Sequence, residues 1–222
     1  MVEIFGNKHA FWQALLFTII IFGFGVILGF FLEDSRSDDV NTKLLTSEIN
    51  VIDGQLRNRI LVDYNVSCDI AMESTFNFAD DIYSQALELE KYDAASTFTD
   101  TLTVLHKRYD ILRTLLWVEA QSIRNKCDGK FHTVVYLYEY NTEDVERKAQ
   151  QIFFSRLLGE LKANNPKEIL LIPIAANMNI SSIDLIVDHY KIGKLPAILI
   201  DEREIVDRVL SEEELEKIVF RQ

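Results

Sequence analysis

The chain of 222 residues is long enough for one membrane anchor and one or two modest domains. It carries 35 acidic and 23 basic residues, a formal net charge of −12, and no basic run anywhere. So acidic a surface disfavours nucleic-acid phosphates and anionic lipid headgroups, and we therefore expect no nucleic-acid partner.

Ala10 to Leu32 is an uncharged apolar stretch. As a helix it would extend roughly 34 Å, at about 1.5 Å per residue, which is enough to cross the hydrocarbon core of a bilayer. A cleavable signal peptide would have a shorter apolar region that ends in small residues, whereas this one ends in two phenylalanines and a leucine. We therefore predict a tail over 1–9 and an uncleaved transmembrane helix over 10–32, in contact with membrane lipid.

The charges that flank this span predict its orientation. Lys8 precedes the span, whereas several acidic residues and only Arg36 follow it closely. Because the basic side tends to stay in the cytoplasm, we expect a single-pass cell-membrane protein with a cytoplasmic N-terminus and extracytoplasmic C-terminal domains. Gly25 and Gly29 have the spacing that lets membrane helices pack closely, so this pattern also allows a homo-oligomer.

Helical periodicity runs over residues 40–128, after a short polar linker over 33–39. Apolar residues recur at steps of three and four, and Asp128-Gly129 provides a stop signal. We predict a small antiparallel helical bundle with nearly all of these apolar residues in its core. The three apolar stripes are Leu45, Ile49, Ile52, Leu56 and Ile60; Cys68, Met72, Phe76, Ala79, Ile82, Ala86 and Leu89; and Leu102, Leu105, Tyr109, Leu112, Leu116 and Ile123.

Residues 130–222 alternate between strand and helix patterns. Their order is strand, helix, strand, helix, strand, strand, helix, which is typical of an α/β domain. The chain as a whole is therefore expected to be mixed α+β and α/β: a transmembrane helix, a helical bundle and a C-terminal α/β domain. The predicted strands are Val134 to Tyr140, Glu168 to Pro173, Ala197 to Asp201 and Arg203 to Val209. The predicted helices begin at the N-cap Asn141 or Thr142, at Ser181 and at Glu212.

This order resembles the thioredoxin fold. The sequence Gly193-Lys194-Leu195-Pro196-Ala197 resembles the loop that carries the cis-proline of that family, just before a strand. A trans proline that starts an edge strand is the alternative interpretation. Together with the N-terminal span, the arrangement is similar to small membrane-tethered thioredoxin-like proteins of archaea.

One feature of the family is missing. Thioredoxin-like oxidoreductases carry Cys-x-x-Cys where the first strand enters the first helix, whose N-terminus activates a thiol. Here Val145 and Lys148 occupy the two cysteine positions, and no cysteine follows Cys127. The resemblance thus implies a domain without dithiol chemistry that keeps a surface for an extended peptide. The candidate peptide-binding residues are Thr142, Val145, Lys148, Lys194 and Leu195, with Pro196 as the candidate cis-proline.

Cys68 and Cys127 are the only thiols, near the start of one predicted helix and the end of another. Antiparallel packing would bring both to the same end of the bundle, where an oxidising compartment would join them in a disulfide. Two buried free cysteines in a cytosolic protein, or a redox-active pair, are the alternatives.

No pattern for a metal or a cofactor is present. The histidines His9, His106, His132 and His189 are isolated, and no glycine-rich phosphate loop occurs, so we predict no catalytic residue, metal or cofactor. Asn65-Val66-Ser67 and Asn179-Ile180-Ser181 fit the acceptor pattern of N-glycosylation, which matters only outside the cytoplasm.

The function that we expect is that of a membrane-anchored, redox-inactive binding or scaffold module for a protein or peptide client, not an enzyme. One alternative is a thiol-disulfide oxidoreductase, or the non-catalytic partner of one, that uses Cys68 and Cys127. Another is a structural anchor that oligomerises.

Overall fold

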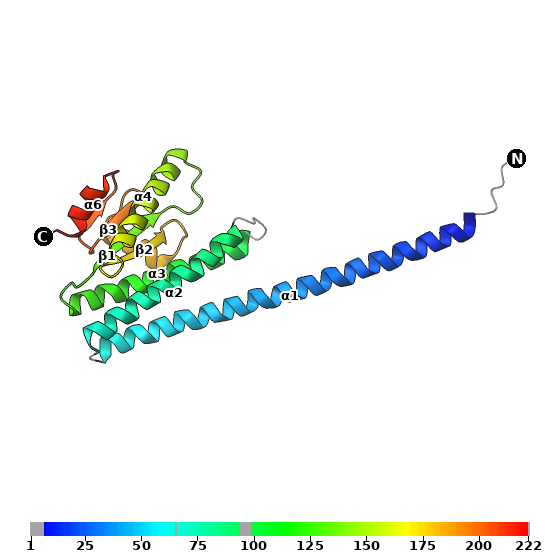
Figure 1. Cartoon of the computed structure of the whole chain (residues 1–222), viewed down its shortest axis with the longest axis horizontal. Coiled ribbons are helices and arrows are strands. Elements are labelled where there is room, and N and C mark those ends of the chain that lie inside the picture. Colours follow the sequence, from blue (N-terminus) through cyan, green and yellow to red (C-terminus); the bar gives the residue numbers. More distant parts are fainter. Residues whose placement is uncertain (1–6, 65, 94–98, 222) are drawn as a thin grey trace. The chain divides into compact units, whose positions relative to one another are not determined.

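The computed structural model describes residues 7–64, 66–93 and 99–221 (Figure 1). Its contacts divide the chain into two units, Met1–Ile49 and Asn50–Gln222. The helix α1 (Asn7–Asp63) contributes residues to both. Of the tail predicted over 1–9, residues 7–9 are helical and the rest lies outside the described residues.

The first unit contains the apolar segment Ala10–Phe31, which is long and apolar enough to cross a membrane, with a mean hydropathy of 2.6. None of this apolar segment is buried within the protein, as a lipid-facing helix requires. The prediction of a polar linker over 33–39 is corrected by the structure, in which these residues are part of the helix α1. They are charged but include neither proline nor glycine, so nothing in this stretch breaks the helix.

The second unit begins with a helical bundle, in which the end of α1 packs with α2 (Cys68–Asp93) and α3 (Thr99–Lys126). Leu61, Ile82, Leu112 and Ile123 are buried in it, as members of a single apolar cluster. Residues of the second and third predicted stripes therefore form core.

The first predicted stripe does not form core. Ile52, Leu56 and Ile60 on α1 are exposed, as is Ile49 in the first unit, and the side chain of Leu45 lies outside the described residues. The face of α1 that packs instead carries Gly54, where an added Cβ would lie 2.9 Å from Leu115 Cδ2 and 3.1 Å from Phe78 Cζ. Glycine thus permits a close helix approach that a count of apolar residues does not register.

The rest of the second unit is a four-stranded sheet in the order β2-β1-β3-β4. β1 and β2 are parallel, with Leu137 opposite Ile174, whereas β3 is antiparallel to both β1 and β4. The predicted order of strands and helices is present. The elements are β1 (His132–Tyr138), α4 (Val145–Asn164), β2 (Ile169–Ala175), α5 (Ser181–His189), β3 (Ala197–Ile200), β4 (Glu204–Val206) and α6 (Glu212–Val219).

Helices cover both faces of this sheet (Figure 1). On one face, Phe154 of α4 and Leu215 of α6 pack against Val134 and Ile198. On the other, the bundle and α5 join the sheet in one continuous apolar cluster that includes Leu116, Leu137 and Ile172. A bundle over 40–128 and a separate domain over 130–222 were predicted, whereas the part of the bundle within the second unit has a common core with residues 130–222.

The outer edge of the sheet, along β2, is partly closed. Ala176 N–H donates to Tyr138 O (2.8 Å), so the even-numbered residues of β2 direct their backbone N–H and C=O groups towards β1. In a parallel ladder the backbone groups of the odd-numbered residues then point away from β1; these residues are Ile169, Leu171, Pro173 and Ala175. Three features occupy these positions: Lys162 Nζ donates to Ile169 O (2.8 Å), Pro173 has no N–H, and Ala175 N–H donates to Asp110 Oδ1 (3.2 Å). Such devices oppose pairing with a strand of another chain.

The buried carboxyl group of Asp110 makes stability depend on pH. Burial raises the pKa of Asp110 from 3.8 to about 6, although Arg113, the Ala175 N–H and His106 oppose the shift. A raised pKa means that the folded state holds the proton more tightly than the unfolded state, so this site contributes stability below about pH 4 that is lost as pH rises through about 6.

We therefore expect the free energy of unfolding of the protein, relative to that of Asp110→Asn, to increase by about 2 kcal/mol between pH 7 and pH 4. Taking the difference cancels the other carboxylates, which titrate in both proteins. Urea unfolding in detergent, followed by the fluorescence of buried Trp117, measures it. Parallel pH profiles for the two proteins would contradict this expectation.

Candidate functional site

The ends of three elements meet at one edge of the sheet, which we call the carboxyl edge. β1 and β2 are parallel and both finish there, at Tyr138 and Ala175. β3 starts there, since Ala197 pairs with Leu137. The carboxyl edge therefore consists of three connecting segments: 139–144 after β1, 176–180 after β2 and 190–196 before β3.

Side-chain amides hold the first two segments in place. Tyr140 N–H donates to Asn177 Oδ1 (2.7 Å), and Asn177 Nδ2 donates to Tyr140 O (2.9 Å). In the same way, Glu139 N–H donates to Gln151 Oε1 (2.9 Å), and Gln151 Nε2 donates to Glu139 O (3.1 Å). Each amide replaces a missing strand partner with two hydrogen bonds, so both loops have a defined backbone.

The start of α4 lies next to these loops. Its N-cap is Asp144, whose Oδ1 accepts hydrogen bonds from Glu146 N–H (3.0 Å) and Arg147 N–H (3.1 Å). The N-cap predicted at Asn141 or Thr142 is therefore wrong. Asn141 instead has a φ of 52° and makes the turn out of β1, a conformation that asparagine tolerates better than most residues.

An ion pair joins the loop to the helix. Arg147 Nη1 donates to Glu139 Oε1, and this bond lowers the pKa of Glu139. The pair therefore keeps the carboxylate ionised. Because both partners are occupied with each other, neither is the free acid or base that proton transfer would need.

The structure places the predicted site residues at this edge. Val145 is the first residue of α4 and is 82% exposed, and Lys148 is exposed one turn later on the same face. From the third segment, Lys194 is exposed and Leu195 is half-buried. Thr142 is half-buried, and the Leu195–Pro196 peptide bond is cis, with Pro196 buried directly before β3.

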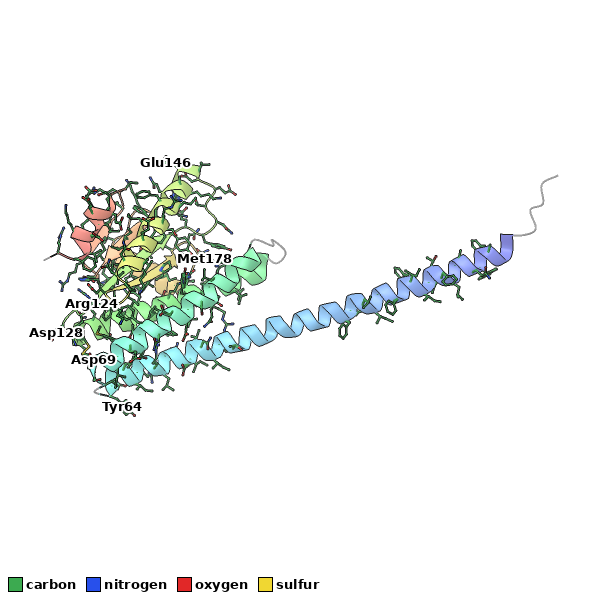
Figure 2. All side chains as sticks on the ribbon, viewed as in Figure 1. Tyr64, Asp69, Arg124, Asp128, Glu146 and Met178 are labelled. Atoms are coloured by element: carbon green, nitrogen blue, oxygen red, sulfur yellow. A yellow bond between two sulfur atoms is a disulfide. The ribbon has the colours of Figure 1, made fainter. Side chains whose placement is uncertain are left out.

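The two cysteines lie elsewhere. Cys68 and Cys127 form a disulfide between the start of α2 and the end of α3. Their neighbours Asp69 and Asp128 mark that end of the unit in Figure 2, well away from Glu146 at the start of α4. Cys127 is only 2% exposed, so an attacking thiolate has little access to its sulfur. This arrangement is typical of a structural disulfide.

A polar cluster that was not predicted from the sequence lies at the opposite end of the strands from the carboxyl edge, where β1 begins and β3 finishes. His132 Nδ1 lies 2.8 Å from Asp201 Oδ2, and Arg124 Nη2 lies 3.0 Å from the same oxygen. Glu202 Oε1 accepts hydrogen bonds from Trp117 Nε1 (2.7 Å) and Thr133 Oγ1 (2.8 Å). These contacts join α3 and β1 to the turn between β3 and β4. Because the residues are far apart in sequence, no local motif predicts the contacts.

An apolar groove of about 340 Å³ lies between α3 and α5. Gln121 Nε2 donates to the Tyr190 hydroxyl (3.4 Å) across it. The groove is lined by Trp117, Val118, Gln121, Leu185, Ile186, His189 and Tyr190.

Among the described residues, no cluster of histidine, cysteine and carboxylate side chains could hold a metal ion.

Comparison with protein-family models, with curated proteins and with solved structures gives no match to this chain.

Proposed function

We propose that the protein is a membrane-anchored, redox-inactive binding or scaffold module that docks an extended protein or peptide segment at its carboxyl edge. The observation that carries the proposal is that an exposed helix start and the segment that leads into β3 both lie at the carboxyl edge. Val145 offers apolar surface there, and Lys148 on α4 and Lys194 in the segment 190–196 are exposed cations. Ordered loops reduce the entropy lost on binding.

The C-terminal part is proposed to be thioredoxin-like. The sheet order β2-β1-β3-β4, with β1 and β2 parallel and the last two strands antiparallel, supports this interpretation, as does a proline directly before β3. Val145 and Lys148 then stand where redox members of that family have cysteines. A domain of this kind keeps the docking edge and lacks the nucleophile.

The proposed orientation puts the N-terminus in the cytoplasm and Asn50–Gln222 outside it. Lys8 before the apolar span supports this side, because basic flanks tend to stay in the cytoplasm. The Cys68–Cys127 disulfide supports it too, because disulfides persist in oxidising compartments. Docking would then take place outside the cytoplasm, at the surface of the anchoring membrane.

Peptide binding tests the proposal. We expect full-length protein in detergent to bind a subset of a fluorescent library of extended peptides, and both Val145→Glu and Lys194→Glu to weaken that binding about tenfold, as loss of a buried anchor or a paired charge does. Lys217→Glu on α6 is the matched control, since Lys217 is also exposed, and it should leave binding unchanged. Fluorescence anisotropy measures all three.

If no peptide binds, or if binding survives both substitutions, the docking proposal is wrong. The oxidoreductase alternative has a separate readout, the reduction of insulin. We expect the protein to be inactive in that assay before and after Cys68→Ser. Activity that disappears in Cys68→Ser would favour the alternative.

A further inference from the structure

We propose that Asn179 is an N-glycosylation site, and that its glycan borders the carboxyl edge. This inference rests on the proposed extracytoplasmic position of the second unit. Asn179-Ile180-Ser181 fits the acceptor pattern, in which the hydroxyl two residues after the asparagine assists transfer. The other pattern begins at Asn65, which lies outside the described residues.

The local structure presents this asparagine to solvent. Asn179 is exposed, with a φ of 53°, and Ser181 is exposed as the first residue of α5. Buried residues on either side, Met178 and Ile183, anchor the loop to the core, and Figure 2 labels the first of them. The loop therefore holds Asn179 outward whether or not the side chain carries a glycan.

A neighbouring asparagine provides the contrast. Both polar atoms of the Asn177 side chain are engaged with Tyr140, and Met178-Asn179 follows it, so it lacks the acceptor pattern. Two asparagines in one loop thus differ in role: Asn177 holds the loop and Asn179 is available to a modifying enzyme.

The disulfide and the apolar span indicate the compartment. A bond between Cys68 and Cys127 persists where thiols are oxidised, and the segment Ala10–Phe31 delivers a chain to a membrane. N-glycosylation takes place on that same side of a membrane. The pattern and the exposure therefore select Asn179, and the disulfide independently supports the compartment in which it would be modified.

The modification is a group transfer from a lipid-linked saccharide phosphate. The Asn179 Nδ2 forms a bond with the anomeric carbon of the sugar, while the bond between that carbon and the phosphate oxygen of the lipid donor breaks. The phosphate leaves with the electron pair, and the amide loses one proton to solvent. No oxidant or reductant takes part.

The position of the glycan bears on docking. The loop 176–180 is one of the three segments of the carboxyl edge, so a saccharide on Asn179 stands beside the surface proposed for the peptide. An extended peptide segment would still have access to Val145, whereas the saccharide would sterically exclude a folded partner. The glycan would therefore select for exposed, extended clients.

Mass spectrometry of full-length protein purified from membranes of its own cells tests the proposal. We expect the tryptic peptide that contains Asn179 to carry a saccharide, and fragmentation to place it on that residue. The added mass should disappear in Asn179→Gln and in Ser181→Ala and remain in Asn177→Gln, which keeps the acceptor pattern. Ser181→Ala retains Asn179 itself, so a loss there reports the pattern.

An unmodified Asn179 overturns the proposal. Labelling of intact cells with a membrane-impermeant thiol reagent, after reduction of the disulfide, then shows whether the orientation fails as well. If Cys68 is labelled from outside, the proposed orientation stands and only the glycan is excluded. If it is protected from the reagent, both fail.

Discussion

Replacing Arg57 with alanine is expected to lower the free energy of unfolding by about 3–5 kcal/mol, because it strands a buried carboxylate. Arg57 Nη2 lies 2.8 Å from Glu119 Oε2, and the Glu119 side chain is fully buried. Thr75 Oγ1 donates to the other carboxylate oxygen (3.2 Å), but a neutral hydroxyl cannot replace the lost positive charge. Arg57→Ala also removes the guanidinium that lies 3.6 Å from the centre of the Phe78 ring.

Urea unfolding, followed by Trp117 fluorescence, gives the measurement. Burial already raises the pKa of Glu119, so without Arg57 this residue should bind a proton more readily in the folded state. The stability deficit of Arg57→Ala should therefore be largest at neutral pH and shrink as the pH falls. The exposed Arg59 on the same helix is the matched control, and Arg59→Ala should change stability by no more than about 0.5 kcal/mol.

A double substitution separates the cost of a stranded charge from the value of the pair itself. Arg57→Met with Glu119→Leu removes both charges and keeps similar volumes, so it should recover most of the stability lost in Arg57→Ala. The single hydroxyl proton of Thr75, which donates to Glu119 in the unaltered protein, would then donate to Ala71 O, 2.9 Å from Oγ1. A double variant as unstable as Arg57→Ala would show that local packing, rather than the buried charge, sets the cost.

Removing the disulfide should have an effect of similar size. It closes a loop between residues 59 apart, which stabilises by about 4 kcal/mol when it restricts the unfolded chain. The variant Cys68→Ser with Cys127→Ala is suitable, because a hydroxyl at the buried position 127 would add a penalty of its own. Its urea midpoint should fall accordingly.

Reduction supplies the internal control for this experiment. A reductant should lower the stability of the unaltered protein towards that of the double variant and leave the double variant unchanged. Equal stability of the two proteins before reduction would contradict the prediction.

Elements with strong local signals were predictable from the sequence. The strand around Val134 and Leu137, the helix that starts at Ser181 and the capped helix from Glu212 are present within a few residues of their predicted bounds. The two cysteines also could be paired, because helix periodicity placed them at one end of a bundle.

Features that depend on distant residues were not predictable. The stripe through Ile52 and Leu56 is apolar but exposed, since the packing face of α1 relies on Gly54 and on the Arg57–Glu119 pair, which no periodicity scores as core. Likewise, His132 looked isolated because its partner Asp201 is 69 residues away in the chain. The resemblance placed Val145 and Leu195 together, but the ordering contacts of Gln151 and Asn177 emerged only from the structure.

The core common to helices and strands has a consequence for anyone who divides this protein. A fragment that starts after Gly129 would lose the bundle side chains that pack with Leu137, Ile172 and Leu199, and α5 alone would remain to cover that face of the sheet. The apolar surface left exposed would favour aggregation. The bundle is thus part of the folded unit and cannot be removed without exposing the core of the sheet. A soluble version should be cut ahead of residue 50, where the chain passes from one unit to the other.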